Sequence, residues 1–279
     1  MPIVLHRNRK MSDTGYSVLI SVYSGTDPVF LEMSLKSIFG QTVPSDDIVI
    51  VTDGPVTDEV DKILSGCGDR ITIVRLPENR GLGDALNAGL KHCRYELVAR
   101  MDDDDISLPD RMEKQLRAFE NDPSLDLLSG TVEEFQKEPG DLQGARKLPL
   151  EHKEILAFSK KRNPFNHPAI MMRKNAVLEA GGYNGQFPLF EDYSLWVRML
   201  MRGSIGRNLP DTLVYMRVDD RTYLRRGGFS YAKHMLRFHR MLHREKWTTL
   251  GDYLTGALPH ALVCILPNAL RKGIYKKLH

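Results

Sequence analysis

The chain has 279 residues, of which 42% are hydrophobic and 27% are charged, values that fit a folded globular protein and exclude a disordered or fibrous one. This length suffices for one large α/β domain with an appended segment. The three cysteines lie far apart, which excludes a disulfide framework and a cysteine-based zinc site and favours a reducing compartment.

No segment is typical of export or of membrane insertion. The first residues lack the apolar core and the cleavage site of a signal peptide, and we expect residues 1–15 to form a flexible lead-in. The longest apolar stretch, 257–270, contains two prolines and falls short of the roughly 18 apolar residues that a spanning helix needs. We therefore expect a cytoplasmic protein that meets the cell membrane only peripherally, on its inner face.

The net charge of +3 conceals a strong asymmetry along the chain. Residues 221–279 hold 12 Lys or Arg against two acidic residues, a net charge of +10. The preceding residues hold 27 basic against 34 acidic side chains, a net charge of −7. A basic tail on an acidic body indicates a tail that meets an anionic surface or ligand.

Strands and helices alternate four times in the first part of the chain. Short β-rich apolar runs predict four strands, at 16–23, 47–52, 71–76 and 96–101. Helices are predicted between them, beginning at Pro28, near Asp58 and at Gly83. This alternation predicts a parallel sheet with helices on its faces.

Ligands of such sheets bind beyond the carboxyl ends of the strands, so we expect the chemistry there. The polar strand ends are residues 21–25, 52–54 and 102–105.

The alternation is lost after Gly130. The polar segment 138–144 predicts a loop or a hairpin at the sheet edge. Further on we expect a strand at 169–173, a helix at 192–202 and a strand near 212–218.

The basic tail contains one segment of amphipathic character. Between Tyr231 and Trp247, basic residues alternate with apolar ones, namely Met235, Leu236, Phe238, Met241 and Leu242. This pattern is typical of a helix that lies in a membrane interface, and equally of a helix docked on its own core.

Four consecutive aspartates follow the fourth predicted strand. Adjacent carboxylates repel one another unless a cation lies among them, and Mg²⁺ or Mn²⁺ prefers oxygen ligands. In an extended segment alternate side chains share a side, so Asp102 and Asp104 would face one ligand. The alternative is an acidic loop that caps a helix beginning near Pro109 through Asp105 or Ser107.

Two features near the second and third strands suit a nucleotide. Asp53 is placed to accept a hydrogen bond from a base N–H or a ribose hydroxyl, with a plain Asp-Gly turn as the alternative. Arg80 lies in the segment Asn79–Gly83, a glycine-containing turn before a helix that lacks the GxGxxG fingerprint and the phosphate-loop lysine. This segment is weak evidence for a phosphate cradle.

Glu191 and Asp192 open a helix whose apolar face includes Trp196. A core-anchored helix would hold Asp192 at the edge of a pocket, where it could act as a general base. The alternative is that the two acids merely complement the helix dipole.

Three further basic residues are candidate contacts. His167 lies between two prolines in a rigid loop, where a lone histidine is more often structural than catalytic. Arg225 and Arg226 precede two glycines and suit a diphosphate, or else form solvated surface charge.

Taken together, these segments resemble the family 2 glycosyltransferases, in particular the branch that builds bacterial exopolysaccharide, capsule and O-antigen. The resemblance covers residues 16–223, with a weaker similarity in the tail. It depends on seven ordered motifs: Ser21-Val-Tyr23, Ser37-Ile-Phe-Gly-Gln-Thr42, Val51-Thr-Asp-Gly-Pro55, Asn79-Arg-Gly-Leu82, Ala85-Leu-Asn-Ala-Gly89, Ala99-Arg-Met-Asp-Asp-Asp-Asp105 and Glu191-Asp-Tyr-Ser-Leu-Trp196.

The resemblance implies a glycosyltransferase A-type (GT-A) α/β fold with a mixed central sheet flanked by helices. Residues 16–220 would form the catalytic domain, with a nucleotide-binding half at 16–106 and an acceptor half at 107–220. Residues 221–279 would form a basic, amphipathic helical extension.

The same resemblance implies roles for individual residues. The nucleotide would be bound by Asp53 at the base, by the backbone near Val22 and Tyr23, and by Arg80, Asp102 and Asp103.

The family's Asp-any-Asp element maps onto Asp102 and Asp104, with Asp104 the direct ligand of a Mn²⁺ or Mg²⁺ cofactor. Asp105 adjoins it, and because all four residues are aspartate the register stays open by one residue. Asp192 matches the family's catalytic base, and Glu191 lies beside it. The remaining donor or acceptor contacts would be Glu191, Trp196, His167, Arg225 and Arg226.

We thus expect an inverting, metal-dependent glycosyltransferase with a nucleotide-diphosphate sugar as donor, a UDP-sugar first of all, and a lipid-linked glycan as acceptor. The Gln-any-any-Arg-Trp element of processive synthases is missing, which favours single additions. The alternatives are a sugar nucleotidyltransferase, which would need a glycine-rich phosphate loop after Tyr23, and a catalytically silent adaptor of the same fold. No nucleic-acid motif accompanies the basic tail, so nucleic acid is not an expected partner.

Overall fold

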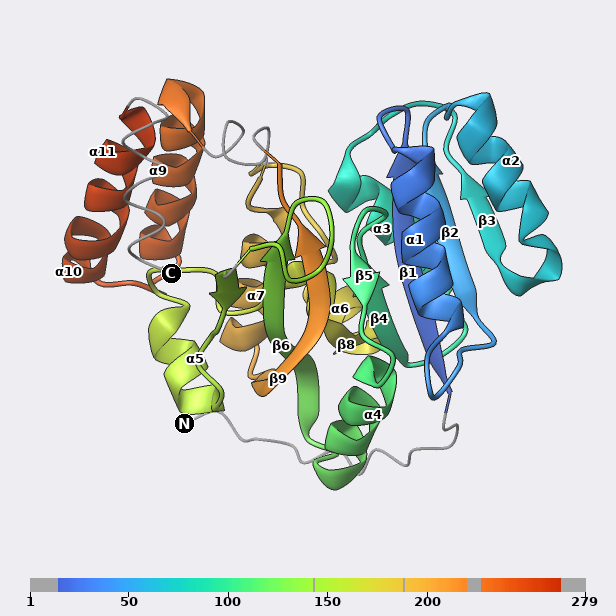
Figure 1. Ribbon diagram of the computed structural model, residues 1–279. Helices are drawn as coiled ribbons and strands as arrows, with labels where there is room; N and C mark the ends of the chain where they lie inside the picture. The colour runs from blue at the N-terminus through green and yellow to red at the C-terminus, as the bar shows by residue number, and fades with distance from the viewer. Residues whose placement is uncertain (1–14, 143, 188, 220–226, 267–279) are drawn as a thin grey trace.

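The computed structural model describes residues 15–142, 144–187, 189–219 and 227–266. Within them a single nine-stranded mixed sheet runs through the molecule in the order β3-β2-β1-β4-β8-β6-β9-β5, with β7 paired to β6 (Figure 1). The strands are β1 (Tyr16–Tyr23), β2 (Ile48–Asp53), β3 (Thr72–Arg75), β4 (Leu97–Met101), β5 (Ile106–Ser107), β6 (Leu125–Phe135), β7 (Gly144–Arg146), β8 (Met171–Arg173) and β9 (Ile205–Arg217).

Helices cover both faces of this sheet. One apolar cluster joins it to α1 (Pro28–Phe39), α2 (Asp58–Gly66) and α4 (Arg111–Asn121). The cluster on the opposite face involves α3 (Leu82–Leu90), α5 (His152–Phe158), α6 (Lys174–Glu179) and α7 (Glu191–Met201). The described part of the tail adds α9 (Gly228–Arg244), α10 (Leu250–Asp252), a π-helical turn (Tyr253–Ala257) and α11 (Leu258–Ile265).

The first half of the sheet is parallel, as the alternation of strands and helices predicts. β1 pairs in parallel with β2 and β4, and β2 pairs in parallel with β3. The second half is mixed, because β8 runs antiparallel to both β4 and β6 whereas β6 and β9 are parallel. Parallel pairing requires a helical crossover, and the chain supplies one between each pair of early strands.

Local sequence signals fix several element boundaries. Asp27 accepts hydrogen bonds from the amides of Val29 (2.9 Å) and Phe30 (3.3 Å), so α1 begins at Pro28 as expected. The segment 138–144 connects β6 to β7, an antiparallel pair, which confirms the predicted edge hairpin. The strand expected near 212–218 begins earlier, at Ile205, because its pairing with β6 tolerates irregular register around Pro210.

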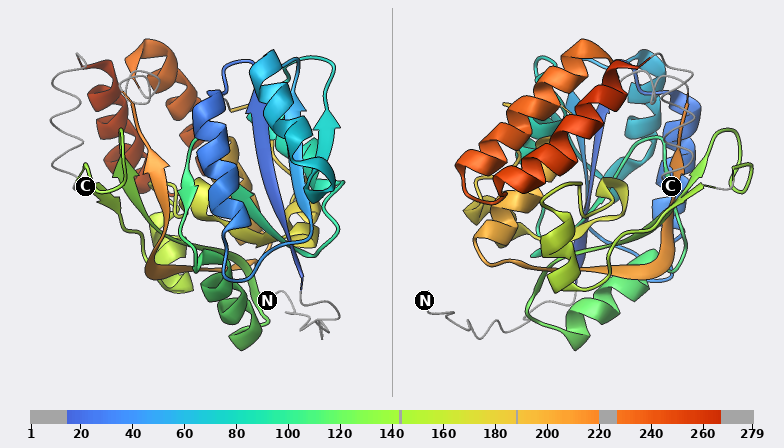
Figure 2. Two further views of the ribbon diagram at one scale, coloured as in Figure 1. Left: turned by 45° about the vertical axis from the view of Figure 1, so that its right-hand side comes forward. Right: turned by 90° about the vertical axis from the view of Figure 1, so that its left-hand side faces the viewer.

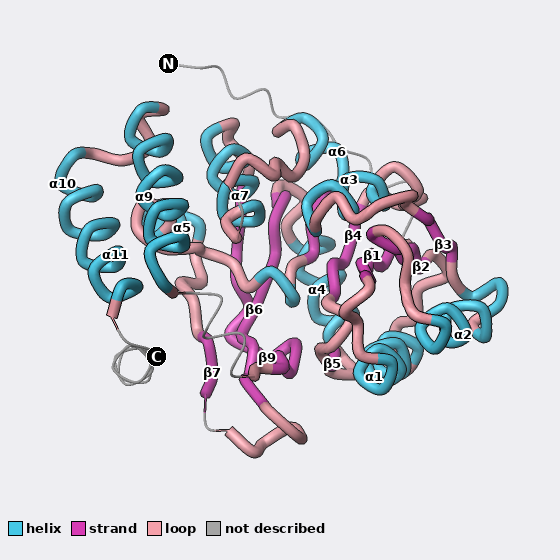
Figure 3. Tube along the Cα trace, turned by 90° about the horizontal axis from the view of Figure 1, so that it is seen from above, coloured by secondary structure: helices cyan, strands magenta, loops and turns pink. Residues whose placement is uncertain are grey.

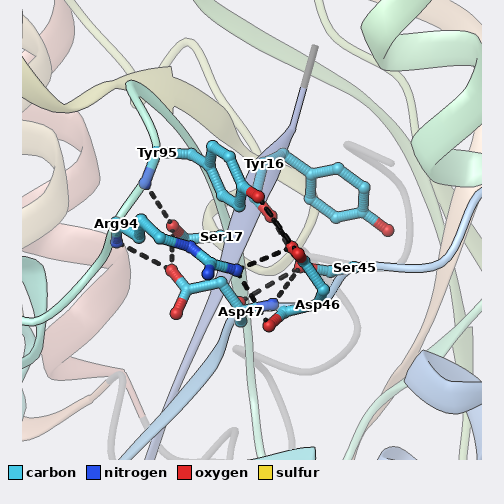
Figure 4. Close-up of polar contacts among 7 residues, drawn as sticks. All are labelled: Tyr16, Ser17, Ser45, Asp46, Asp47, Arg94 and Tyr95. Carbon is cyan, nitrogen blue, oxygen red and sulfur yellow. Dashed lines mark hydrogen bonds and ion pairs between the residues drawn. The ribbon is translucent and has the colours of Figure 1, made fainter. Parts of the chain in front are cut away.

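The amino-terminal edge of the sheet is closed by a polar cluster of seven residues, Tyr16, Ser17, Ser45, Asp46, Asp47, Arg94 and Tyr95 (Figure 4). Asp47 Oδ2 accepts from the Ser17 hydroxyl (2.5 Å) and from the Arg94 amide (2.7 Å). These bonds tie the beginnings of β1 and β2 to the segment that leads into β4. The cluster therefore stabilises the packing of the strand beginnings. It lies at the edge opposite to the carboxyl ends of the parallel strands, where ligands bind in such sheets.

The described part of the tail packs against the body of the protein. The side chains of Met235, Phe238 and Leu242 on α9 are fully buried, in a cluster with Phe187 and Phe190. The prediction that this apolar face lies in a membrane interface is therefore wrong, and the alternative of a docked helix is confirmed. No helix among the described residues is long and apolar enough to cross a membrane. Residues 1–14, predicted to form the lead-in, lie outside the described residues.

Candidate active site

Three strand ends meet at one edge of the sheet. Tyr23 at the end of β1 is in register with Asp53 at the end of β2, and Met101 at the end of β4 is in register with Ile20. The aspartates that follow Met101 therefore lie at the edge where Asp53 also lies, as the sequence predicts. Seen along the sheet, β1, β2 and β4 lie next to one another (Figure 3).

Asp53 organises the turn before α3. Its Oδ1 accepts from the amide of Arg80 (2.7 Å) and its Oδ2 from the amide of Gly81 (2.9 Å), and its side chain is buried. Gly54 follows with φ of 81°, and a side chain there would place its Cβ 2.6 Å from the amide nitrogen of Asn79. Asp53 and Gly54 thus stabilise the turn that carries Arg80, Asp53 through hydrogen bonds and Gly54 through close backbone packing. The contact of Asp53 with a nucleotide base stays a prediction.

The four aspartates form a turn, not an extended segment, so the expected sharing of one side by Asp102 and Asp104 through strand alternation is wrong. Each carboxylate has its own surroundings. The Asp102 carboxylate accepts hydrogen bonds from both terminal nitrogens of Arg100, with 2.6 Å between Nη1 and Oδ2. The Asp103 carboxylate accepts a hydrogen bond from the hydroxyl of Thr26. Asp105 accepts from the amide of Arg217 at 2.7 Å.

The helix-cap interpretation of the aspartates fails as well. α4 begins at Arg111, its N-cap residue Asp110 makes no capping hydrogen bond, and the free amide of Met112 donates instead to the Gln41 side chain (3.2 Å). Ser107 instead accepts a hydrogen bond from the Gln41 side chain (3.1 Å), and Asp105 is turned toward Arg217. The acidic turn therefore has no role in starting the helix.

Three carboxyl groups of the acidic turn 102–105 have raised pKa values, because they are buried close to one another. Burial, reinforced by the charges of Asp102 and Asp103, raises the pKa of Asp104 to about 7. Burial raises the pKa of Asp103 to about 6, and burial together with its acidic neighbours raises the pKa of Asp105 well above its ordinary value. The Oδ2 atom of Asp105 is buried without a hydrogen-bond partner. Crowded, desolvated carboxylates of this kind are the oxygen donors that Mg²⁺ and Mn²⁺ bind.

The described residues do not enclose a metal ion on their own. Among them no group of three or more His, Cys, Asp or Glu side chains is arranged to hold one. Mg²⁺ at nucleotide sites usually takes one or two carboxylates and completes its shell with phosphate oxygens and water, so the acidic turn fits a cation that arrives with a diphosphate.

Arg217, at the end of β9, anchors this turn from the strand that pairs with β5, the strand directly after the turn. Its Nε donates to the Asp104 carbonyl (3.1 Å), and its guanidinium lies 3.7 Å from the centre of the Phe30 ring and 4.4 Å from that of Phe135. Neither Arg217 nor Arg100 was predicted from the sequence. Arg100 leaves a local signal, a charged residue in an apolar strand two positions before an aspartate, whereas Arg217 is separated by 112 residues from its partner Asp105.

Asp192 lies in the first turn of α7, as predicted. Its Oδ2 accepts from the side-chain amide of Asn163 (2.7 Å) and its Oδ1 from the amide of Tyr193 (2.7 Å). Burial raises the pKa of the neighbouring Glu191. The Glu191 side chain lies beside the start of α3, 3.7 Å from where a Cβ on Gly83 would stand. The carboxylates of α7 therefore adjoin the Asp53-supported turn.

A buried polar and aromatic group joins Asp192 to the acidic turn. His167 Nε2 is 2.9 Å from the Tyr183 hydroxyl, and both rings pack edge-on or tilted around Trp196. Burial raises the pKa of Tyr183, Arg100 opposes this, and Asp192 and Asp102 both add to the increase. The charges of Asp192 and Asp102 therefore both act on the Tyr183 hydroxyl, which indicates that the two carboxylates lie in the neighbourhood of this side chain.

Several predicted site residues have other roles. Trp196 is fully buried in the core, so its prediction as a ligand contact is wrong, because its ring instead supports His167 and Tyr183. Burial and the charge of Arg100 hold the pKa of His167 well below its ordinary value, so this ring is a neutral hydrogen-bonding partner of Tyr183. The Val22 side chain is fully buried, which leaves only its backbone for a ligand.

Of the other predicted contacts, the Tyr23 side chain is 43% exposed at the end of β1. Arg225 and Arg226 lie outside the described residues, and their predicted contact with a diphosphate stays a prediction.

A mixed sheet whose parallel half ends in a carboxylate turn, with the carboxylates of α7 near the start of α3, fits the GT-A type of α/β fold. The chain matches the model of Glycosyl transferase family 2 over residues 17–182, and it belongs to this family. The protein is a glycosyltransferase, as its sequence predicts.

Several of its relatives are bacterial glycosyltransferases, and two are named for amylovoran and O-antigen biosynthesis. The chain is 37% identical over 265 residues to the UDP-Gal:alpha-D-GlcNAc-diphosphoundecaprenol beta-1,3-galactosyltransferase of Escherichia coli, covering 94% of this chain and 96% of that protein. It is 36% identical to the amylovoran biosynthesis glycosyltransferase AmsE of Erwinia amylovora, covering 94% and 98%.

Solved structures share the fold. The mannosyltransferase PcManGT from Pyrobaculum calidifontis, in complex with GDP-Man and Mn²⁺, superposes with a TM-score of 0.62 at 21% identity over 95% of this chain and 80% of that one. S. aureus TarS 1–349 in complex with UDP-GlcNAc gives 0.61 at 16% identity over 92% and 72%. In the comparison with the S. aureus TarS crystal structure, the aligned region covers 38% of that chain. These likenesses confirm the GT-A fold.

Proposed function

We propose that this glycosyltransferase moves a sugar from a UDP-sugar to a hydroxyl of a sugar carried on a lipid diphosphate, in one displacement that inverts the anomeric carbon. The observation that carries the proposal is the packing of Tyr183 and Glu191 against Gly83 at the start of α3, next to the turn held by Asp53. The charges of Asp192 and Asp102 both add to the raised pKa of the Tyr183 phenol. The E. coli relative supports the choice of substrates, because its name specifies UDP-Gal and GlcNAc-diphosphoundecaprenol.

Asp192 is the general base in this proposal. Hydrogen bonds from Asn163 and from the Tyr193 amide fix the orientation of its carboxylate, and the core packing of Trp196 anchors its helix. A fixed carboxylate at the edge of the donor site takes the proton from the acceptor hydroxyl as that oxygen attacks the sugar. His167 and Tyr183, which contact each other at 2.9 Å, are both neutral and do not compete for the proton.

Asp104 and Asp102 are the residues that would hold the divalent cation, with Asp104 as the direct ligand. The raised pKa of Asp104 and the unpartnered Oδ2 of Asp105 support a cation here. When bound, Mn²⁺ or Mg²⁺ neutralises negative charge on the departing diphosphate. Arg100 holds the Asp102 carboxylate in place, and Arg217 fixes the backbone of the turn.

The acceptor defines where the enzyme works. A lipid diphosphate stays in a bilayer, so we propose peripheral contact of this protein with the membrane through its basic C-terminal segment. Single additions fit an enzyme that extends one lipid-linked glycan by one sugar.

A binding screen followed by a transfer assay tests the proposal. Thermal unfolding is measured with UDP-, GDP- and dTDP-sugars, each with and without Mn²⁺; we expect the largest rise in Tm with a UDP-sugar and Mn²⁺. The wild-type protein is then incubated with UDP-Gal and a GlcNAc-diphospholipid, and mass spectrometry should detect one added hexose. Binding without transfer to any lipid-linked acceptor would leave an adaptor of the same fold as the explanation.

A further inference from the structure

The helices of the described tail form an outer layer on one flank of the molecule. α9 and α11 lie side by side, farthest from β3 (Figures 1 and 2). α9 faces inward with Met235, Phe238 and Leu242, and Ala261 and Cys264 of α11 belong to the same buried cluster.

The helical stretch from α10 through α11 (250–265) exposes its large apolar side chains to solvent instead of burying them. Its buried residues are small: Ala257, Ala261 and Cys264. Its large apolar residues are exposed instead, namely Leu250 (60%), Leu254 (49%), Leu258 (37%), Leu262 (68%) and Ile265 (39%). A helix that served only to cover the core would bury its leucines and expose polar residues. The exposed set, here called the leucine row, is an apolar surface with no partner among the described residues.

The backbone keeps the leucine row in line. In a regular α-helix two residues eight positions apart differ by about 80° around the axis. The π-helical turn at Tyr253–Ala257 takes up one residue more than an α turn, which returns Leu258 close to the line of Leu250. Because π turns are rare, their use here to align exposed leucines indicates a function for the row.

Positive charge is exposed on α9, the helix that packs against α11, and close to the π turn. α9 contains no acidic residue, and its four Lys or Arg residues, Lys233, Arg237, Arg240 and Arg244, are all exposed and recur at the spacing of one helix face. Next to the π turn, the Lys161 side chain lies 3.2 Å from where a Cβ on Gly256 would stand. An apolar row in the same helical layer as exposed cations matches the chemistry of an anionic lipid surface, with leucines in the acyl boundary and cations at the phosphates.

The layer also contacts the catalytic helix. Phe238 of α9 stacks on Phe190, the residue before Glu191, with ring centres 5.3 Å apart, and packs 4.8 Å from the ring of Tyr193, which follows Asp192. A bilayer held by the outer side of this layer would therefore be separated from the helix that carries the base by the layer itself.

We infer that the leucine row, together with the exposed cations of α9, docks the enzyme on an anionic phospholipid bilayer. This inference rests on the proposed lipid-linked acceptor and identifies the surface that brings the enzyme to it. The proposed membrane-binding surface is thus the leucine row and not the apolar face of α9, because that face is buried in the core.

Vesicle sedimentation of the full chain tests this surface. Wild-type protein should sediment with vesicles of phosphatidylethanolamine and phosphatidylglycerol, and much less with phosphatidylcholine alone. Changing Leu258→Ser together with Leu262→Ser should weaken partitioning about tenfold or more, because two exposed anchors are lost. Arg237→Gln with Arg240→Gln should weaken it by a similar factor at low salt. Leu178→Ser, at an equally exposed leucine of α6, is the matched control and should bind like wild type.

Three results would overturn the inference: wild-type protein that stays in the supernatant, a leucine double variant that binds as well as wild type, or light scattering showing that the row joins two copies of the chain. Transfer to a short-chain, water-soluble acceptor separates this question from the proposed function. The leucine double variant should retain normal transfer to that acceptor, whereas absence of transfer by the wild type would refute the proposed function and leave the vesicle result standing.

Discussion

Asp192 is oriented in part by a side chain far away in the sequence, since the Asn163 amide donates a hydrogen bond to its Oδ2. Acids at strand ends and helix starts leave a local pattern, so the sequence indicates where the candidate site residues lie along the chain. Their surroundings are not predictable in the same way. Arg217 reaches the acidic turn from β9 and Thr26 from the segment after β1, contacts that only the tertiary fold creates.

Replacing Asp192 by Asn tests its role as the base. The amide keeps the size of the side chain but cannot accept the proton, and it replaces one of the two acceptor oxygens with an N–H donor. We expect kcat to fall about 10²- to 10⁴-fold while the Kd for UDP with Mn²⁺ is unchanged. Steady-state kinetics and calorimetry measure the two quantities. Glu120→Gln, the same change at an exposed acid of α4, is the control, and normal turnover by Asp192→Asn would remove this residue from the mechanism.

Cation binding should depend on pH through Asp104. Its pKa is raised to about 7 by burial and by neighbouring carboxylates, and only the ionised form binds a metal. Affinity for Mn²⁺ in the presence of UDP should therefore be highest above pH 7 and fall by up to about tenfold per pH unit below it. Calorimetric titrations across this range measure the trend. Asp104→Asn should bind Mn²⁺ weakly at every pH, and a wild-type affinity that does not change with pH would contradict this account.

At the scale of elements, the period of the apolar residues predicts the early strands and helices closely, because each is local and repeats a simple pattern. β6 and β9 are harder to predict. Their long pairing passes through bulges, and β9 contains Asn208 and Pro210, which break the alternation expected of a strand. The docking of α9 was likewise one of two interpretations, since an amphipathic pattern does not specify what covers it.

Gly89 shows how α3 packs on the sheet. A Cβ at this position would lie 2.3 Å from Leu19 Cδ1 and 2.6 Å from Val51 Cγ2, both in fully buried side chains. Gly89→Ala should therefore destabilise the protein by about 1–3 kcal/mol, although alanine favours helix formation. Urea unfolding measures the change. At Gly66, where no atom lies within 4 Å, the same substitution should be neutral or slightly stabilising. Equal effects at both glycines would contradict close packing of α3.

At the scale of the whole molecule, the tail and body form one packed unit whose interface contains His239. Burial, aided by the charge of His260, lowers the pKa of His239 to about 4. The unfolded chain holds this histidine at its ordinary pKa of about 6.5, so between these values the unfolded state binds more protons. The corresponding stability is complete above about pH 6.5 and is lost as the pH falls toward 4.

This linkage predicts a change of slope in His239→Gln. Wild-type unfolding free energy should fall as the pH is lowered from about 6.5 to 4, by up to about 1.4 kcal/mol per pH unit for this one histidine. The variant should show a flatter dependence whatever its absolute stability. Urea unfolding at a series of pH values measures both slopes, and parallel curves would show that His239 is not neutral in the folded protein.

A crystal structure with Mn²⁺ and an intact UDP-sugar tests the central claim most directly. The account predicts a manganese ion on Asp104, the diphosphate beside it, and the anomeric carbon facing the side of the pocket where Asp192 lies. A donor bound elsewhere, with residues 102–105 in contact with neither the metal nor the diphosphate, would contradict it.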